Sequence, residues 1–154
     1  GVESMGVLRI EKGHFVVGRE ADGRTSPYDV GLSRMISAHK WFVGKEALRL
    51  PIMSDTNRRQ LVGIVPIKVE ERLPNSANLV SASSPTSVTG SQGWITSLTY
   101  SPTLGHDIAL ALLNNGRSRI GEELVASAPI ADHSIGVRVV SPHFFDPKGE
   151  RQNA

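Results

Sequence analysis

The histidines and their acidic neighbours are the residues whose types could support proton transfer. The chain has five histidines, and two of them stand beside carboxylates, in His106-Asp107 and in Asp132-His133-Ser134. An imidazole paired with a carboxylate is the arrangement that general bases and Ser-His-Asp triads use. However, residues adjacent in a turn rarely point toward one another, and neither stretch carries the signature of an oxyanion hole. These residues therefore do not predict a hydrolase.

Metal and nucleotide chemistry also lack their usual patterns. No two histidines have the i, i+4 spacing of a helical zinc site. The chain has no cysteine, which excludes disulfides, thiolate metal sites and cysteine nucleophiles. Neither a G-x-G-x-x-G stretch nor a P-loop occurs. We therefore expect neither a metal site nor a nucleotide site on this chain.

The composition is typical of a soluble globular protein of one or two small domains. Of the 154 residues, 39% are hydrophobic and 21% are charged. The formal net charge of +2 argues against nucleic acid or an anionic membrane as the main partner. No apolar run approaches the roughly 20 residues of a membrane span, and no signal-peptide pattern opens the chain. We expect a cytoplasmic protein with no membrane partner.

The first fifty residues predict short helices and turns. Apolar residues at helical spacing indicate a helix over residues 2–12, with Gly13 as its C-terminal cap. Residues 14–18 read as a short strand. Ser26 followed by proline is typical of a helix start, and residues 44–50 could form another short helix.

After Pro51 the pattern becomes that of a β protein. A loop rich in serine, threonine and glycine is expected over residues 83–93. Short strands with turn residues between them favour a small antiparallel barrel or sandwich, and hence an α+β chain. The expected strands are 61–67, 78–82, 94–100, 108–113, 121–125 and 135–140.

These patterns divide the chain into four parts. We expect an N-terminal segment at 1–50, a linker at 51–59, a barrel domain at 60–142 and a tail at 143–154. About fifty residues are too few for a separate core, so the first part should pack on the barrel or on a parent domain. Because the chain starts inside an expected helix and without methionine, we expect it to be a piece of a larger protein. Phe144-Phe145 would anchor the tail against that parent or a partner subunit.

Four sequence blocks, in this order, carry a resemblance to a known family. The chain resembles the C-terminal end of the α subunits of heterotetrameric sarcosine oxidases. More broadly, it resembles the aminomethyltransferase (glycine-cleavage T-protein) superfamily. The closing D-P-K-G-E-R favours the oxidase subunits over stand-alone T-proteins. The blocks are L-R-I-E-K-G (8–13), T-S-P (25–27) with G-L-S-R-M-I-S (31–37), I-T-S-L-T-Y-S-P-T-L-G (95–105) with I-A-L-A-L-L (108–113), and V-R-V-V-S-P-H-F-F-D-P-K-G-E-R (137–151).

The resemblance implies a fold and a function. Residues 1–50 would be the tail of an aminomethyltransferase-like α/β folate-binding domain, followed by the small antiparallel β-barrel. The parent enzyme would oxidatively demethylate sarcosine to glycine and pass the one-carbon unit to tetrahydrofolate. FAD, FMN and NAD would belong to the parent complex and not to this chain. The partners would be the rest of the α subunit and the β, γ and δ subunits.

Departures from the family pattern limit what this chain could do. The family's proposed acidic catalytic residue and its Y-T-G-E motif lie upstream of the first block and have no counterpart here. T-proteins carry an arginine where Met5 stands and a tryptophan where Arg34 stands. We therefore expect scaffold and partial folate-pocket wall, without catalysis by the isolated chain.

Four residues are candidates for that wall, each with a structural alternative. Glu11 could orient the folate site, or form an ion pair near the helix end. Tyr28 and Asp29 could line the pterin pocket, or form a helix start with Asp29 favourably placed near the dipole. Arg34 could stack on folate or bind its glutamate tail, since guanidinium suits both, or be a surface residue.

Two alternative functions stay open. One is another folate-dependent relative, such as dimethylglycine oxidase or a T-protein. The other is a barrel module that binds RNA or protein without chemistry. An RNA-binding face would need exposed aromatics, and the chain has only two Trp, two Tyr and four Phe. Trp94 is expected in the core or in an interface.

Overall fold

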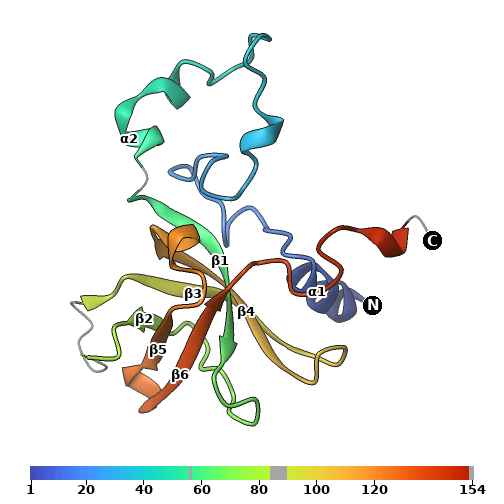
Figure 1. Ribbon diagram of the computed structural model, residues 1–154, viewed down its shortest axis with the longest axis vertical. Helices are drawn as coiled ribbons and strands as arrows, with labels where there is room; N and C mark the ends of the chain where they lie inside the picture. Colours follow the sequence, from blue (N-terminus) through green and yellow to red (C-terminus); the bar gives the residue numbers. More distant parts are fainter. Residues whose placement is uncertain (56, 84–89, 153–154) are drawn as a thin grey trace.

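A closed β-barrel forms the body of the protein, with one helix against its side. The computed structural model describes residues 1–55, 57–83 and 90–152. In Figure 1, helix α1 (Val2–Glu11) lies beside the barrel near the C-terminal tail, and the segment from 31 to 55 extends away from the barrel. Much of the loop expected at 83–93, namely 84–89, lies outside the described residues.

The barrel closes through antiparallel pairs in the order β1-β4-β3-β2-β5-β6 and back to β1. Closure leaves no free edge along these strands, which removes a route to edge-to-edge association. The predicted α+β class and small antiparallel barrel are confirmed. The strands are β1 (Arg59–Pro66), β2 (Asn78–Val80), β3 (Gly93–Ser101), β4 (His106–Asn114), β5 (Glu123–Ala128) and β6 (His133–Val140).

Strand β4 is buried on both faces, which explains its continuous apolar sequence. Its odd-numbered residues from 109 to 113 join the core inside the barrel. Its even-numbered residues from 108 to 112 form a second cluster on the outer face, with Ile10 of α1 and Leu61 of β1. A strand with one solvated face would alternate apolar and polar residues. The outer cluster is therefore one of the contacts that fix the N-terminal segment to the barrel.

Helix α1 ends where the sequence predicts. Lys12 is the C-terminal cap, and Gly13 follows in the left-handed region with φ +72°. Glycine adopts that conformation without the steric cost that a Cβ imposes. The buried residues of the helix are Ile10 and Glu11, whereas Val2, Met5 and Leu8 are exposed.

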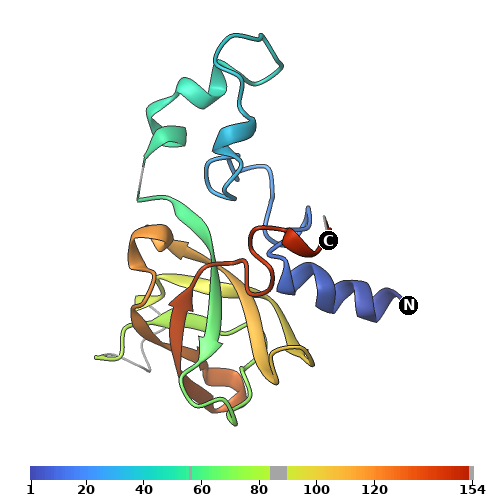
Figure 2. The same ribbon diagram turned by 45° about the vertical axis from the view of Figure 1, so that its right-hand side comes forward.

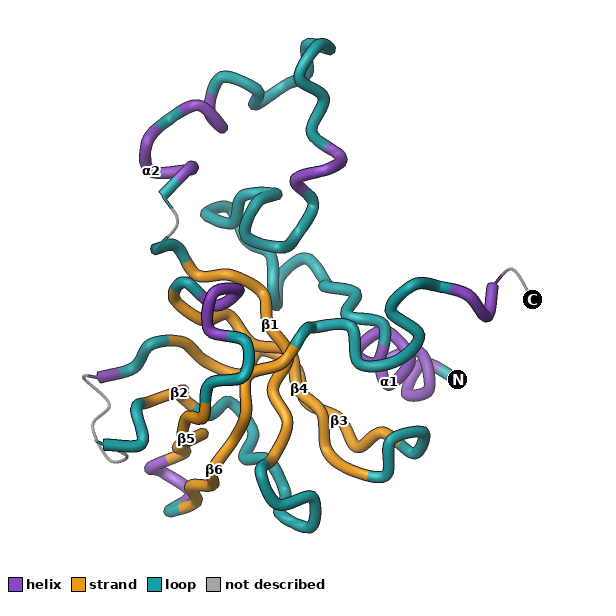
Figure 3. Tube along the Cα trace, viewed as in Figure 1, coloured by secondary structure: helices purple, strands orange, loops and turns teal. Residues whose placement is uncertain are grey.

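The other N-terminal predictions are partly wrong. Residues 14–18 form no strand but an isolated bridge between Val17 and Ala21. Residues 26–29 form a turn and not a helix start. The helix expected at 44–50 reduces to a 3-10 turn, η2 (Ala47–Arg49), followed by α2 (Pro51–Ser54) (Figure 3). The further 3-10 turns that lie wholly within the described residues are η1 (Ser33–Met35), η4 (Gly116–Arg119), η5 (Pro129–Ala131) and η6 (Glu150–Gln152).

The C-terminal tail is anchored on this chain. Phe144 packs against the outer cluster, and the backbone N–H groups of Phe144 and Phe145 both donate to the Glu11 carbonyl oxygen at 3.0 Å. Figure 2 shows the tail leaving β6 and crossing over to the end of α1. The barrel of this chain therefore supplies a contact for Phe144, and the expected contact of Phe144-Phe145 with a parent domain or partner stays a prediction.

Candidate functional site

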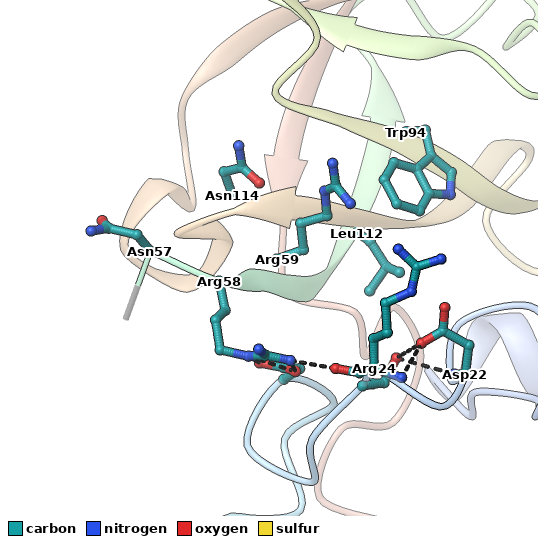
Figure 4. A pocket seen from close by; sticks show the side chains of 10 residues that line it. Asp22, Arg24, Asn57, Arg58, Arg59, Trp94, Leu112 and Asn114 are labelled. Atoms are coloured by element: carbon teal, nitrogen blue, oxygen red, sulfur yellow. Dashed lines mark hydrogen bonds and ion pairs between the residues drawn. The ribbon is translucent and has the colours of Figure 1, made fainter. Parts of the chain in front are cut away.

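A cavity of about 450 Å³ lies between the loop at 22–29 and the outer face of the barrel. Cavities that bind small molecules are typically about 300–1,000 Å³ and combine apolar surface with a few polar groups. Figure 4 shows that the walls come from the loop, the start of β1 and strands β3 and β4. The lining residues are Asp22, Arg24, Thr25, Asp29, Asn57, Arg58, Arg59, Trp94, Leu112 and Asn114.

The loop wall is held by a turn around Asp22. The Asp22 carboxylate accepts hydrogen bonds from the Arg24 backbone N–H at 2.8 Å and the Thr25 hydroxyl at 3.0 Å. Aspartate is favoured in such turns because its side chain can satisfy the backbone two residues on. The bond from the Arg24 backbone, followed by that from Thr25, lowers the pKa of Asp22. The Asp22 carboxylate thus accepts its hydrogen bonds from within its own loop.

Asp29 and Arg58 join the loop to the barrel. The Arg58 Nη2 lies 2.7 Å from Asp29 Oδ2, and its Nε lies 3.1 Å from both carboxylate oxygens. The Ser26 backbone N–H donates to the same carboxylate at 2.8 Å. The hydrogen bond to Asp29 is the main cause that raises the pKa of Arg58. Because Asp29 is buried and Arg58 nearly so, this paired geometry fixes the loop rather than offering a free charge.

Arg58 uses its remaining donors on backbone carbonyls. Its Nη1 donates to the Ile52 carbonyl at 2.9 Å and its Nη2 to the Arg24 carbonyl at 2.5 Å. One guanidinium therefore holds the loop at Arg24, the carboxylate of Asp29 and the segment before β1 together.

Arg24 and Arg59 present the other two guanidinium groups to the cavity. The Arg59 guanidinium lies 4.4 Å from the centre of the Trp94 ring, a cation–π contact. Among the residues that the structure describes, neither the Arg24 nor the Arg59 guanidinium takes part in a hydrogen bond or ion pair. Figure 4 shows Arg24 rising from the loop toward the side of the cavity where Trp94 lies. These groups can bind an anion.

A second cavity of about 710 Å³ lies on the other side of the loop and is more apolar. Segment 29–32 contributes to both, because Asp29 lines the first cavity and Val30 and Leu32 line the second. The second cavity is completed by the end of α1, by Leu61 and by the tail at 141–143.

The structure does not bring the four residues predicted from the sequence into one site. Asp29 lines the first cavity, as described. Glu11 is buried and accepts a hydrogen bond from the Ser101 hydroxyl at 2.5 Å, and it lines neither cavity. Tyr28 is exposed and contributes its backbone carbonyl as an acceptor for Arg117. Arg34 is exposed in η1, away from both cavities.

Sequence reasoning missed Arg24, Arg58 and Arg59 and did not place Trp94 in a site. Two consecutive arginines directly before an apolar strand were the available signal, since charged residues there end up at one end of the barrel. Glu20 was also missed. It is fully buried, and its carboxylate lies 3.3 Å from the Arg9 guanidinium, 2.8 Å from the Val16 backbone nitrogen and 2.9 Å from the Thr96 hydroxyl.

The histidines form no reactive arrangement in the described part of the chain. The His106 Nδ1 lies 2.8 Å from the backbone oxygen of Asp107 and not from its carboxylate. The Asp107 carboxylate instead pairs with Arg72 at 3.0 Å. Over residues 1–55, 57–83 and 90–152, no group of three or more potential ligands could hold a metal ion.

Comparison with known proteins places this fold in a family. The glycine cleavage T-protein C-terminal barrel domain matches residues 59–146, which span all six strands. This chain belongs to that family.

Two kinds of relative extend the similarity beyond the barrel. Sarcosine oxidase subunit alpha of Rhizobium meliloti (strain 1021) is 40% identical over 98% of this chain, and that of Corynebacterium sp. (strain U-96) is 39% identical over 99%. The aminomethyltransferase of Thermotoga maritima is 34% identical over 80% of this chain and 31% of its own length. This chain spans only 15% and 16% of the two α subunits.

A solved structure shares the barrel family's fold. The glycine cleavage system aminomethyltransferase T from Bartonella henselae superposes with a TM-score of 0.75 over 96% of this chain and 39% of that protein, at 21% identity. At that identity the likeness concerns the fold. No helix among the described residues is long and apolar enough to cross a bilayer.

Proposed function

We propose that this chain is the terminal part of a sarcosine oxidase α subunit, in an enzyme that oxidatively demethylates sarcosine and passes the one-carbon unit to tetrahydrofolate. The observation that carries the proposal is the 39–40% identity to such subunits over nearly the whole chain. Within that enzyme, residues 1–50 would end the folate-binding domain, 51–59 would link it to the barrel at 60–142, and 143–154 would be the tail.

The proposed role of the chain is scaffold and partial folate-pocket wall. The loop around Asp29 supports this role, because it is fixed rigidly and borders both cavities. Tyr28 and Arg34 are exposed on the same segment and would face the remainder of the pocket. Glu11 would not contact folate but would position the end of α1 through its hydrogen bond from Ser101.

Tetrahydrofolate fits these residues only in part. The donor-rich edge of a pterin needs a free carboxylate, whereas both oxygens of Asp29 are bound by Arg58. The carboxylates of its glutamate tail need cationic donors, and Arg24 and Arg59 supply those in the first cavity. The chain by itself therefore offers no complete pterin site, and we propose that it is inactive when isolated. We also propose that FAD, FMN and NAD bind to other parts of the parent enzyme.

Two experiments test this proposal. The isolated chain is incubated with sarcosine and tetrahydrofolate, and we expect neither peroxide nor methylene-tetrahydrofolate; turnover would contradict the scaffold role. The chain labelled with ¹⁵N is then titrated with folinic acid, and we expect shifts of the Tyr28 and Arg34 amides. Titration with sarcosine is the control and should leave them unchanged. If folinic acid moves neither amide at millimolar concentration, the pocket-wall role is wrong.

An aminomethyltransferase role is the second candidate, favoured by the 34% identity to the Thermotoga maritima enzyme. The reading frame upstream of this chain decides between them, because an oxidase α subunit should carry a dinucleotide fingerprint and an aminomethyltransferase should not.

A further inference from the structure

We infer that the cavity lined by Arg24, Arg59 and Trp94 is a binding site for small organic carboxylates. This inference extends the proposed contact of Arg24 and Arg59 with the glutamate tail of folate. It rests on the charges and donors of the cavity and requires neither a pterin site nor the rest of the parent.

The charged side chains that line the cavity differ in how fully they are paired with opposite charges. Three arginines and two aspartates line it. Arg58 and Asp29 neutralise each other through three short contacts, and the Asp22 carboxylate accepts from its own loop. The Asp22 charge is offset in part by the nearby Arg24 guanidinium. The three arginines and two aspartates together leave a net charge of +1 on the lining, with Arg59 free of any carboxylate partner in the described residues. The cavity should favour an anion over a neutral molecule or a cation.

The Arg59 guanidinium is held near the Trp94 ring by a cation–π contact. Its central carbon lies 4.4 Å from the ring centroid. This contact takes up no oxygen acceptor, and a guanidinium carries five N–H donors in its plane that can serve a ligand. A planar carboxylate matches that donor edge with two parallel hydrogen bonds.

The Arg24 side chain starts from a backbone that is fixed at both ends of the turn. Its N–H donates to Asp22, and its carbonyl accepts from Arg58. A fixed starting point reduces the conformational entropy that binding must remove. Arg58 is therefore a positioning residue for this site, while Arg24 and Arg59 would contact the ligand.

The rest of the lining suits an organic anion of modest size. Leu112 supplies an apolar surface, and the side chains of Asn57 and Asn114 add amide groups. With about 450 Å³, the cavity can hold a small dicarboxylate but has no apolar enclosure on the scale of a lipid chain. A small dicarboxylate could pack its carbon chain against Leu112 and direct its carboxylate groups toward Arg24 and Arg59.

The test is a titration of the whole ¹⁵N-labelled chain, observed through its indole N–H signals. The chain has two tryptophans, so Trp94 reports on the cavity while exposed Trp41 is an internal reference. Trp41→Phe assigns the two signals. We expect glutarate to move the Trp94 signal in a saturable manner and to leave Trp41 unchanged. Glutaramide, its neutral diamide, and inorganic phosphate are the comparison probes, and both should bind at least about tenfold more weakly.

Variants then assign the contact to the two arginines. Arg24→Gln and Arg59→Gln should each weaken glutarate binding by about tenfold or more, because each removes charge-assisted hydrogen bonds. The matched control is Arg19→Gln, an exposed arginine outside the cavity, which should leave the affinity unchanged. Circular dichroism checks that all variants keep the fold.

The inference is wrong if glutarate does not shift the Trp94 indole signal, or if glutaramide or phosphate binds as tightly as glutarate. It is also wrong if Arg19→Gln weakens glutarate binding as much as Arg24→Gln and Arg59→Gln do. A failure of folinic acid to shift Tyr28 and Arg34 while glutarate still binds would reject the pocket-wall proposal alone.

Discussion

The Nζ of Lys12 lies 3.0 Å from Asp146 Oδ2 and 2.7 Å from the Asp146 carbonyl oxygen. These residues are separated by 134 positions, yet they join the two ends of the chain. Lys12 belongs to L-R-I-E-K-G and Asp146 to the closing D-P-K-G-E-R, so two blocks that carry the family resemblance are in direct contact.

Removing this ion pair should loosen the tail. We expect Lys12→Met to speed amide hydrogen exchange at Phe144 and Phe145, whose N–H groups donate to the Glu11 carbonyl. The control is Lys148→Met, since Lys148 is highly exposed and lies 3.9 Å from its partner Glu150. Equal exchange rates in Lys12→Met and in the unchanged chain would contradict a role for the ion pair in holding the tail.

The same pair predicts a response to acid. The hydrogen bond from Lys12 lowers the pKa of Asp146 below its usual 3.8, with a further contribution from the Glu150 backbone N–H. A carboxyl whose pKa is lower in the folded state stabilises that state above its unfolded pKa of about 3.9 and loses the effect as pH falls through the folded value. The ion pair should therefore be unchanged between pH 7 and 5 and weaken only as the pH falls below 3.8, which loosens the tail but leaves its Phe144 and backbone contacts in place.

An NMR titration of the Asp146 carboxyl measures this pKa directly. Lys12→Met should move the Asp146 pKa upward, toward 3.8. An Asp146 that titrates above 3.8 in the unchanged chain would be incompatible with the geometry described.

Gly13 is required where α1 meets the tail. A Cβ at this position would meet the Pro142 carbonyl carbon at 2.9 Å, and its φ of +72° is unfavourable for other residues. We expect Gly13→Ala to reduce the free energy of unfolding by about 1–3 kcal/mol. Gly6→Ala, inside α1, is the matched control, because nothing lies within 4 Å of the added Cβ. It should stabilise by about 0.5–1 kcal/mol. Urea unfolding measures the free energy of unfolding of both variants. Equal losses in Gly13→Ala and Gly6→Ala would contradict a specific requirement for glycine at position 13.

The barrel could be predicted because its strands carry the information locally. Strand β3 alternates buried and partly exposed residues along most of its length. Strand β4 is apolar from 108 to 113, where Ile10 of α1 and Phe144 of the tail pack against its outer face. The class of fold needs only these periodicities and the turns between them. The end of α1 was predictable for the same reason, since Gly13 acts on its own neighbours.

The cavity could not be predicted because it depends on pairings between distant residues. Asp29 and Arg58 are 29 positions apart in the sequence. No local pattern distinguishes Arg58, whose guanidinium binds Asp29 and two backbone carbonyls, from Arg59, whose guanidinium contacts the Trp94 ring. Ser26 and Asp29 do form the reciprocal hydrogen bonds of a helix start. However, Asp29 is also drawn to Arg58, and its carbonyl accepts from the Leu61 N–H, so the chain turns toward the barrel instead of continuing as a helix.

Glu20 should be among the residues most important for stability. Its buried carboxylate joins Arg9 of α1 to Thr96 and Ser97 of β3. Glu20→Ala would leave the Arg9 guanidinium without its carboxylate and the Ser97 hydroxyl without its acceptor, whereas the Thr96 hydroxyl keeps the Leu110 carbonyl. We expect a loss of about 3–5 kcal/mol in the free energy of unfolding. Glu3→Ala, an exposed glutamate of α1, should stay within about 0.5 kcal/mol. Thermal and urea unfolding measure both, and a Glu20→Ala loss below about 1 kcal/mol would reject the assigned role.

Arg58→Lys separates the positioning role of Arg58 from its charge. Lysine keeps the positive charge but cannot match both oxygens of Asp29 and also reach the Ile52 and Arg24 carbonyls. We expect a loss of about 1–3 kcal/mol in the free energy of unfolding, because hydrogen bonds to a nearly buried carboxylate are removed. Because the turn at Arg24 would lose its anchor, glutarate binding should also weaken although Arg24 and Arg59 are unchanged. Arg34→Lys, an exposed arginine, is the control for stability and should change it by less than about 0.5 kcal/mol. An Arg58→Lys variant that keeps both its stability and its glutarate affinity would show that charge alone, and not the paired geometry, holds the loop against the barrel.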